Sequence, residues 1–172
     1  TPLLEPLLIE NNLGEIFSKK KLNQIRIAET EKYAHVTYFF NGGIEESYEG
    51  EDRVLIPSPR VETYDQRPEM SALELTKELI KRIKKNKYSL IVTNFANTDM
   101  VGHTGNFKAT VKAVETVDSC IGKILEQCKK NDYTLIITAD HGNADLMYDV
   151  KKSIPCTMHS INPVPFIICE KI

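Results

Sequence analysis

Aspartate and histidine occur together at two places in this sequence, a third place carries a histidine alone, and these residue types bind divalent metal ions. Asp99 and His103 lie four residues apart, so one helical turn or a tight loop brings both to one cation. Asp140 and His141 are adjacent and follow an apolar run that ends abruptly, while His159 lies in a polar stretch before the last apolar run. Oxygen and imidazole ligands without a thiolate suit manganese, zinc or magnesium, and paired sites of this kind are typical of phosphoryl-transfer enzymes.

Each cluster also has a purely structural explanation. A single aspartate after a strand usually caps a helix, and Gly142 can simply mark a turn. Cys156, three residues before His159, could make a softer metal site, although a buried and inert cysteine is commoner. The clusters together use three of the four histidines of the chain and two aspartates that follow strands, and this combination favours a metal site.

Short β-branched apolar runs alternate with segments of helical periodicity, which predicts an α/β fold with a mainly parallel sheet. Strands are expected at 53–56, 89–95, 133–139 and 164–169, with 24–28 as a weaker fifth. Ligands usually bind at the carboxyl edge of such a sheet. The aspartate clusters follow two of these strands, so we expect them to share that edge.

Two segments predict amphipathic helices. The first covers 71–85 and begins with Ser71 and Glu74, a capping-box spacing. The second covers 107–129, and its apolar stripe is expected to face the sheet. That stripe comprises Val111, Val114, Val117, Ile121, Ile124, Leu125 and Cys128.

The segment 33–40 fits either a strand or a helix, because its residues favour strands while several apolar ones share a helical face. We favour the helix. Thr30 would cap its start, and Asn41-Gly42-Gly43 would end it.

The composition indicates one ordinary domain. The chain has 172 residues, 41% of them apolar, with 22 basic and 24 acidic side chains, so nothing suggests a nucleic-acid-binding surface. Its four cysteines form no paired motif, which predicts a reduced, cytoplasmic protein. The apolar runs have strand length, so no membrane span or signal peptide is expected. Since the chain opens at Thr1, we interpret it as part of a longer protein or a processed product.

Several longer runs are more specific than any of these motifs. They occupy 13–15, 26–37, 40–43, 56–59, 64–65, 68–72, 94–105, 138–143 and 162–166. Through them the sequence resembles the cofactor-independent (2,3-bisphosphoglycerate-independent) phosphoglycerate mutases over nearly its whole length. Members of that family interconvert 2- and 3-phosphoglycerate in glycolysis, so phosphoglycerate is the substrate that the resemblance implies.

The resemblance implies an alkaline-phosphatase-like domain with three layers, in which helices cover both faces of the sheet. It also implies two manganese ions, for which magnesium or cobalt can substitute. By motif, Asp99, His103 and His159 resemble the ligands of one ion, and Asp140 and His141 resemble ligands of the other.

Lys32 resembles the family's active-site lysine, which contacts the phosphoryl group and the nucleophilic serine. From the residues alone it would be a solvated surface lysine, because it follows Glu31 and Glu29 closely. His35 is expected to be a structural histidine with satisfied hydrogen bonds.

The family transfers the phosphoryl group through a phosphoserine, and its serine, a further aspartate ligand and an inserted transferase domain all lie upstream of the matching segment. The resemblance therefore implies that 1–172 is the C-terminal portion of the phosphatase-like domain. Such a portion would be incomplete, would pair with the N-terminal portion and would be inactive alone. The alternatives are another metalloenzyme of the alkaline phosphatase superfamily, or a non-catalytic metal-binding domain.

Overall fold

A three-stranded parallel sheet forms the centre of the computed structural model, which describes residues 9–149 and 153–170. The strand order is β2 (Glu51–Ile56), β1 (Gln24–Glu29) and β3 (Leu90–Asn94). β4 (Leu135–Ile137) pairs antiparallel with β7 (Ile167–Cys169), and β5 (Tyr148–Asp149) pairs with β6 (Ile154–Pro155). The predicted α/β fold with a parallel sheet is confirmed.

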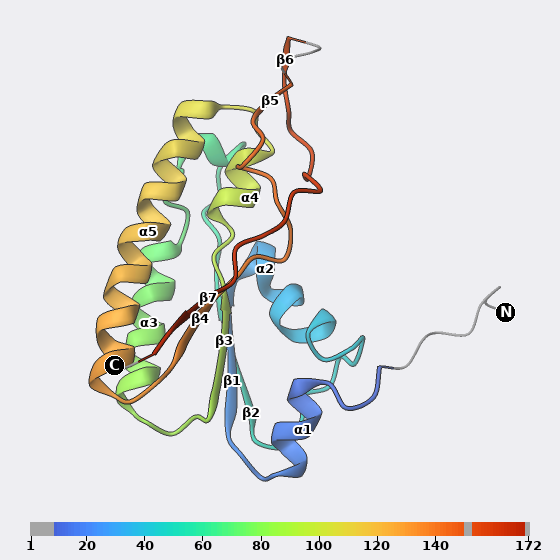
Figure 1. Ribbon diagram of the computed structural model, residues 1–172, viewed down its shortest axis with the longest axis vertical. Coiled ribbons are helices and arrows are strands. Elements are labelled where there is room, and N and C mark those ends of the chain that lie inside the picture. The colour runs from blue at the N-terminus through green and yellow to red at the C-terminus, as the bar shows by residue number, and fades with distance from the viewer. Residues whose placement is uncertain (1–8, 150–152, 171–172) are drawn as a thin grey trace, which may run out of the picture.

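Helices cover both faces of the sheet (Figure 1). One face carries α3 (Ala72–Lys84) and α5 (Phe107–Lys130). The other carries α1 (Leu13–Lys19) and α2 (Thr30–Ala34), which continues as a π-helix over His35–Phe39. Two short elements, the 3₁₀ turn η2 (Tyr64–Gln66) and α4 (Asn97–Gly102), lie near the carboxyl ends of the strands.

The apolar core lies between the sheet and the helices α3 and α5. Ile25 and Ile27 of β1 are fully buried against Leu75 and Leu79 of α3, and Ile124 of α5 completes the cluster. Burying an aliphatic side chain of this size contributes about 1.5–3 kcal/mol. This layer fixes β1 and β3, and therefore the positions of the loops that follow them.

The strand that the sequence predicted most weakly is the central one. All six residues of β1 are buried, yet Gln24, Arg26 and Glu29 are polar, which obscures the apolar pattern. Arg26 is fully buried, donates from Nη2 to Gln24 Oε1 at 2.7 Å and packs over the Phe40 ring at 4.8 Å. One face of β1 is buried through a polar network and not through apolar packing. A hydrophobicity pattern therefore predicts this strand only weakly.

The stripe predicted for α5 is partly wrong. Val111 and Val114 are 42% and 45% exposed, whereas Ala109, Ala113 and Cys120 are buried. Ala109 and Ala113, in the first half of α5, pack in a buried cluster with Val101 of α4. Alanines suit that contact because they allow close approach of the two helices.

The segment 33–40 is helical, as favoured, but its N-terminal cap differs. The helix begins at Thr30, after Glu29, and Thr30 Oγ1 accepts a hydrogen bond from the amide of Ser58 at 3.1 Å. Gly42 and Gly43 end it with φ of +70° and +89°, a conformation that glycine adopts without strain. Ser71 does not cap α3 with its side chain either, since its hydroxyl donates to the Pro57 carbonyl at 2.7 Å.

Strand lengths near the C-terminus are shorter than predicted. β7 begins at Ile167 and not near residue 164, because Pro163 and Pro165 have no N–H to donate to a ladder.

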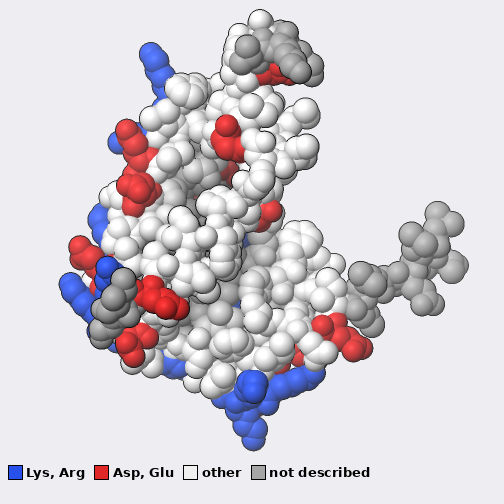
Figure 2. Space-filling model, viewed as in Figure 1, with Lys and Arg blue, Asp and Glu red and all other residues white. Residues whose placement is uncertain are grey.

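All four cysteines are free. In the described part of the chain, no helix is long and apolar enough to cross a membrane. Charges of both signs are scattered over the face shown in Figure 2.

Candidate metal centre

Asp99 and His103 are held together by α4, which follows β3 directly. Asp99 lies in the first turn of this helix and His103 at its C-terminal cap, so their side chains share one face. Asp99 Oδ1 and His103 Nε2 are 3.0 Å apart. The geometry that the four-residue spacing predicts is present.

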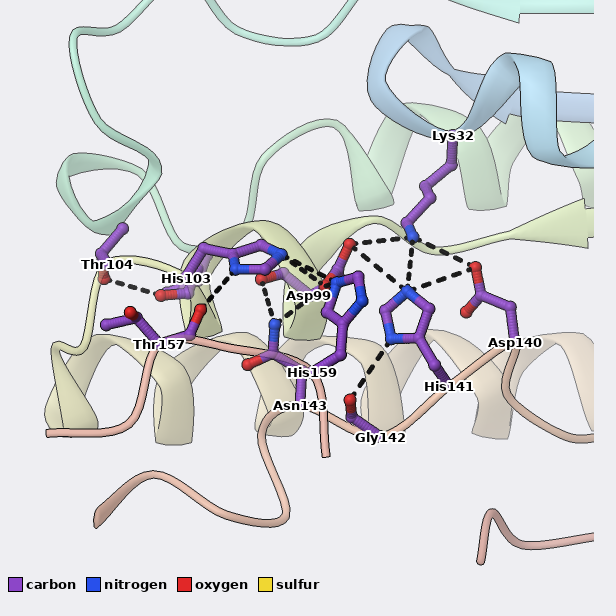
Figure 3. Close-up of polar contacts among 11 residues, drawn as sticks. Lys32, Asp99, His103, Thr104, Asp140, His141, Gly142, Asn143, Thr157 and His159 are labelled. Carbon is purple, nitrogen blue, oxygen red and sulfur yellow. Dashed lines mark hydrogen bonds and ion pairs between the residues drawn. The ribbon is translucent and has the colours of Figure 1, made fainter. Parts of the chain in front are cut away.

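His159 reaches the same point from the loop before β7 (Figure 3). Its Nε2 lies 3.2 Å from Asp99 Oδ1 and 3.0 Å from His103 Nε2. Neighbouring ligands about 2.1 Å from an octahedral cation are about 3.0 Å apart. These three atoms therefore have the mutual separations that one divalent ion requires.

Backbone carbonyls set the orientation of two imidazoles. His103 Nδ1 lies 2.6 Å from the Thr157 carbonyl, and His141 Nδ1 lies 3.3 Å from the Gly142 carbonyl. A carbonyl only accepts, so each Nδ1 donates, and in the neutral imidazole the lone pair is then on Nε2, the atom that faces the cluster. This is the usual arrangement of histidines that bind a metal through Nε2.

Asp140 and His141 follow β4 and complete the cluster. In the described part of the chain β4 pairs with β7 and not with the sheet of β3, so the expectation that both aspartate clusters share the edge of one sheet is not met. His141 stacks on His159 with 3.6 Å between ring centroids. Its Nε2 lies 3.8 Å from Asp140 Oδ2 and 3.9 Å from Asp99 Oδ2. Asp99, His141 and His159 also offer ligand atoms within 4.8 Å of one another, although the group containing His103 is tighter.

Lys32 is buried at the centre of this cluster, so its interpretation as a solvated surface lysine is wrong. Its side chain is 2% exposed, and Nζ lies 2.9 Å from Asp99 Oδ2 and 3.1 Å from Asp140 Oδ2. It also approaches His141 Nε2 at 3.5 Å. The lysine thus neutralises two carboxylates from different parts of the chain, one in α4 and one after β4.

The two carboxylates are tuned by burial and by this lysine. Burial raises the pKa of Asp99, but the hydrogen bonds from Lys32 and Asn143 together with the charges of Lys32 and His103 outweigh it, and the pKa lies below its usual value. Burial likewise raises the pKa of Asp140, but the charge and hydrogen bond of Lys32, the charge of His141 and a backbone hydrogen bond together outweigh it, and this pKa also lies below its usual value. Both groups are therefore ionised near neutral pH and available to a cation.

His35 lies one turn after Lys32 and packs edge-on against Phe39, with ring centroids 5.4 Å apart. Burial lowers its pKa, and the positive charge of Lys32 adds to the effect. Its Nδ1 is buried and finds no hydrogen-bond partner within residues 9–149 and 153–170. The expectation that its hydrogen bonds are satisfied is therefore not met at this atom.

Two neighbouring contacts were not anticipated from the sequence. Asn143 is 4% exposed and donates from Nδ2 to Asp99 Oδ1 at 2.8 Å. Asp145 accepts from the Ser160 hydroxyl at 2.7 Å and from Asn162 Nδ2 at 2.6 Å, which fastens the loop of His141 to the loop of His159. The only indication of these contacts in the sequence is that Asn143 and Asp145 lie close to the candidate ligand His141.

Gly142 is required here for space and not for a turn. Its φ is not positive, but a Cβ at this position would overlap the Ser160 hydroxyl and lie 2.7 Å from Asp145 Oδ1. The backbones of Gly142 and Ser160 form an isolated bridge. Close approach of these two loops is what brings the His141 and His159 rings together.

Fold and site together define a metal-binding α/β protein, and comparisons with known proteins agree. A family model described as the Metalloenzyme superfamily matches residues 4–172, and the chain belongs to that superfamily. It is similar to the 2,3-bisphosphoglycerate-independent phosphoglycerate mutase of Ehrlichia ruminantium (strain Gardel), with 62% identity over 162 residues, 94% of this chain and 32% of the relative. The enzyme of the same name from Clostridium botulinum (strain ATCC 19397 / Type A) is 57% identical over 166 residues, 96% of this chain and 33% of the relative.

A solved structure is similar as well. The Leishmania mexicana phosphoglycerate mutase, crystallised at low cobalt concentration, matches with a TM-score of 0.84 and 35% identity, over 90% of this chain and 30% of the other. The predicted alkaline-phosphatase-like fold is thereby confirmed. The chain spans about a third of the length of the relatives it matches.

Proposed function

We propose that this chain is the C-terminal portion of the phosphatase-like metal-binding domain of a 2,3-bisphosphoglycerate-independent phosphoglycerate mutase. That enzyme is an isomerase that interconverts 2- and 3-phosphoglycerate in glycolysis. The observation that carries the proposal is the meeting of Asp99 Oδ1, His103 Nε2 and His159 Nε2 at 3.0–3.2 Å beside a buried lysine. The identity of 62% to a relative of that name supports the choice of reaction.

The proposed cofactors are two divalent ions, with manganese as the first candidate and magnesium or cobalt as alternatives. Asp99, His103 and His159 hold one ion, and Asp140 and His141 supply part of the second site. When bound, such ions lower the pKa of a serine nucleophile and neutralise charge on a phosphoryl group. The remaining ligands of the second site would come from outside this chain.

Lys32 has the role of a phosphoryl-binding cation. Its ammonium group is positioned by Asp99 and Asp140, at 2.9 and 3.1 Å, and so needs little reorganisation to donate to a phosphoryl oxygen. Positioned donors of this kind contribute most where water is excluded, and the side chain is 2% exposed.

The nucleophile and the groups that bind the rest of phosphoglycerate are proposed to lie in the N-terminal portion. Two serines of this chain have other partners, since the Ser160 hydroxyl donates to Asp145 and the Ser58 hydroxyl donates to Glu29. The free cysteines agree with the proposed cytoplasmic location, where thiols stay reduced.

The test compares this chain with the longer protein that carries it, in an assay of 2- and 3-phosphoglycerate interconversion with manganese. The longer protein should turn over and lose activity in chelator, while the chain alone should not turn over. A longer protein that hydrolyses other phosphate esters and has no mutase activity would point to a different metalloenzyme of the superfamily. Turnover by the chain alone at a similar rate would overturn the assignment of the nucleophile.

A further inference from the structure

Asn143 contacts the candidate ligand Asp99 more extensively than its place in the sequence suggests. It follows His141 by two residues, yet its side chain crosses to α4 (Figure 3). Its Nδ2 donates to Asp99 Oδ1 at 2.8 Å and lies 3.3 Å from the main-chain carbonyl of the same residue. One amide therefore contacts both the carboxylate and the backbone of Asp99.

The two carboxylate oxygens of Asp99 have different partners. Oδ2 accepts from Lys32 at 2.9 Å, and Oδ1 accepts from Asn143 and also faces the Nε2 atoms of His103 and His159. The torsion that turns an aspartate carboxylate is broad and poorly restrained by itself. With Lys32 on one oxygen and Asn143 on the other, the carboxylate has one orientation, and Oδ1 is the oxygen that faces the two imidazoles.

Gly102 provides the space that Asn143 occupies. A Cβ at position 102 would lie 2.5 Å from Asn143 Oδ1 and 3.0 Å from its Cγ. Gly102 is the last residue of α4 and its φ is not positive, so the backbone does not require glycine there. The absence of a side chain at 102 is explained by the amide packed against it.

We propose that Asn143 is a positioning residue for the metal site, which directs Asp99 to bind a divalent ion through Oδ1 alone, and that Gly102 makes room for it. The inference rests on the proposed metal site formed by Asp99, His103 and His159. Hydrogen-bonded partners of this kind commonly set the orientation and basicity of a ligand.

The first test measures Co²⁺ and Mn²⁺ binding by calorimetry in the longer protein that carries this chain, as wild type and as Asn143→Ala. Loss of the amide should weaken binding about 10- to 100-fold. The visible absorption of bound Co²⁺ should also change, because Asp99 can turn and bind through both oxygens. Asn131→Ala is the matched control, since Asn131 donates to the Gln127 carbonyl at the far end of α5 and its loss should leave both readouts unchanged.

A double-mutant cycle separates positioning from general destabilisation. Gly102→Ala should weaken metal binding by displacing the amide, but in the Asn143→Ala background the same change should have no effect. If the wild type binds metal and Asn143→Ala binds it with the same affinity, the inference is overturned. It is also overturned if Gly102→Ala weakens metal binding by the same factor in the Asn143→Ala background. If Asn143→Ala does not fold, the metal affinity and the Co²⁺ absorption spectrum of Gly102→Ala are compared with those of the wild type. Weaker binding and a changed spectrum support the inference, and unchanged values overturn it. Failure of the wild type to bind metal would instead refute the proposed function.

Discussion

Replacing Lys32 with methionine should make the protein markedly less stable when no metal is bound. Methionine keeps most of the volume and removes the charge that lies 2.9 Å from Asp99 and 3.1 Å from Asp140. The two carboxylates would then be partly buried without a cation between them, and burial would raise both pKa values.

The size of the loss follows from the burial of the three groups. Removing one partner of a buried ion pair costs about 3–5 kcal/mol. Lys32 is 2% exposed and Asp99 13%, but the Asp140 side chain is 34% exposed and water screens part of its charge. We therefore expect a loss near the lower end, about 3 kcal/mol at pH 7.

The sign of the pH dependence follows from the lowered pKa values of Asp99 and Asp140. A carboxyl whose folded pKa is lowered contributes stability above its unfolded pKa, and loses that contribution as pH falls through the folded pKa. Both groups have an ordinary pKa of 3.8. The stability difference between wild type and Lys32→Met should therefore be complete at pH 7. It should narrow as the pH falls, first through the raised pKa values of the variant and then, below 3.8, through the lowered pKa values of the wild type.

The assay is urea denaturation with chelator at several pH values, and the control is Lys112→Met. Lys112 pairs with Glu115 at 3.6 Å, and both side chains are more than 60% exposed. Loss of this pair should therefore change the free energy of unfolding by less than about 0.5 kcal/mol. Saturating Mn²⁺ should restore part of the stability that Lys32→Met loses, because a divalent ion replaces the missing charge. A variant as stable as wild type at pH 7 in chelator would refute the reasoning.

Three further outcomes are expected. His103→Ala should weaken Mn²⁺ binding measured by calorimetry more than His141→Ala, and the reverse ranking would mean that the two sites are assigned wrongly. Glu29 is fully buried and burial raises its pKa, so its stability contribution is present below the ordinary value of 4.5 and is lost as pH rises through the folded pKa. Glu29→Gln should therefore be more stable than wild type at pH 7 in thermal unfolding, with a flatter pH profile, and an unchanged profile would contradict this. Ile136 and Ile168 are paired in register and are 55% and 52% exposed, so they form an exposed apolar patch on the β4–β7 pair. This chain alone should therefore self-associate in sedimentation measurements, and Ile168→Lys should reduce the association; a monomeric chain would count against such a patch.

Sequence reasoning recovered what depends on periodicity and on local spacing. The long helices, the parallel sheet and the helical turn joining Asp99 to His103 all follow from patterns within a few residues of one another. The meeting of His159 with this pair was anticipated only because separate clusters were expected at one edge of a sheet. That expectation depends on topology, which an α/β alternation largely determines.

What the sequence left open depends on partners that are distant in the chain. A lysine beside two glutamates resembles a surface residue until its partners Asp99 and Asp140 arrive from other loops. The buried polar residues Gln24 and Arg26 hide a central strand for the same reason. Asn143 carries no periodic or motif signal, and its role depends on the missing Cβ at position 102.

The central claim is that Asp99, His103 and His159 form a divalent metal site. The most direct measurement is anomalous diffraction at the manganese edge from crystals of the protein grown with Mn²⁺. An anomalous peak within about 2.3 Å of Asp99 Oδ1 and of both Nε2 atoms is the predicted result. Density without such a peak at full Mn²⁺ saturation, with Lys32 still bridging Asp99 and Asp140, would contradict the account.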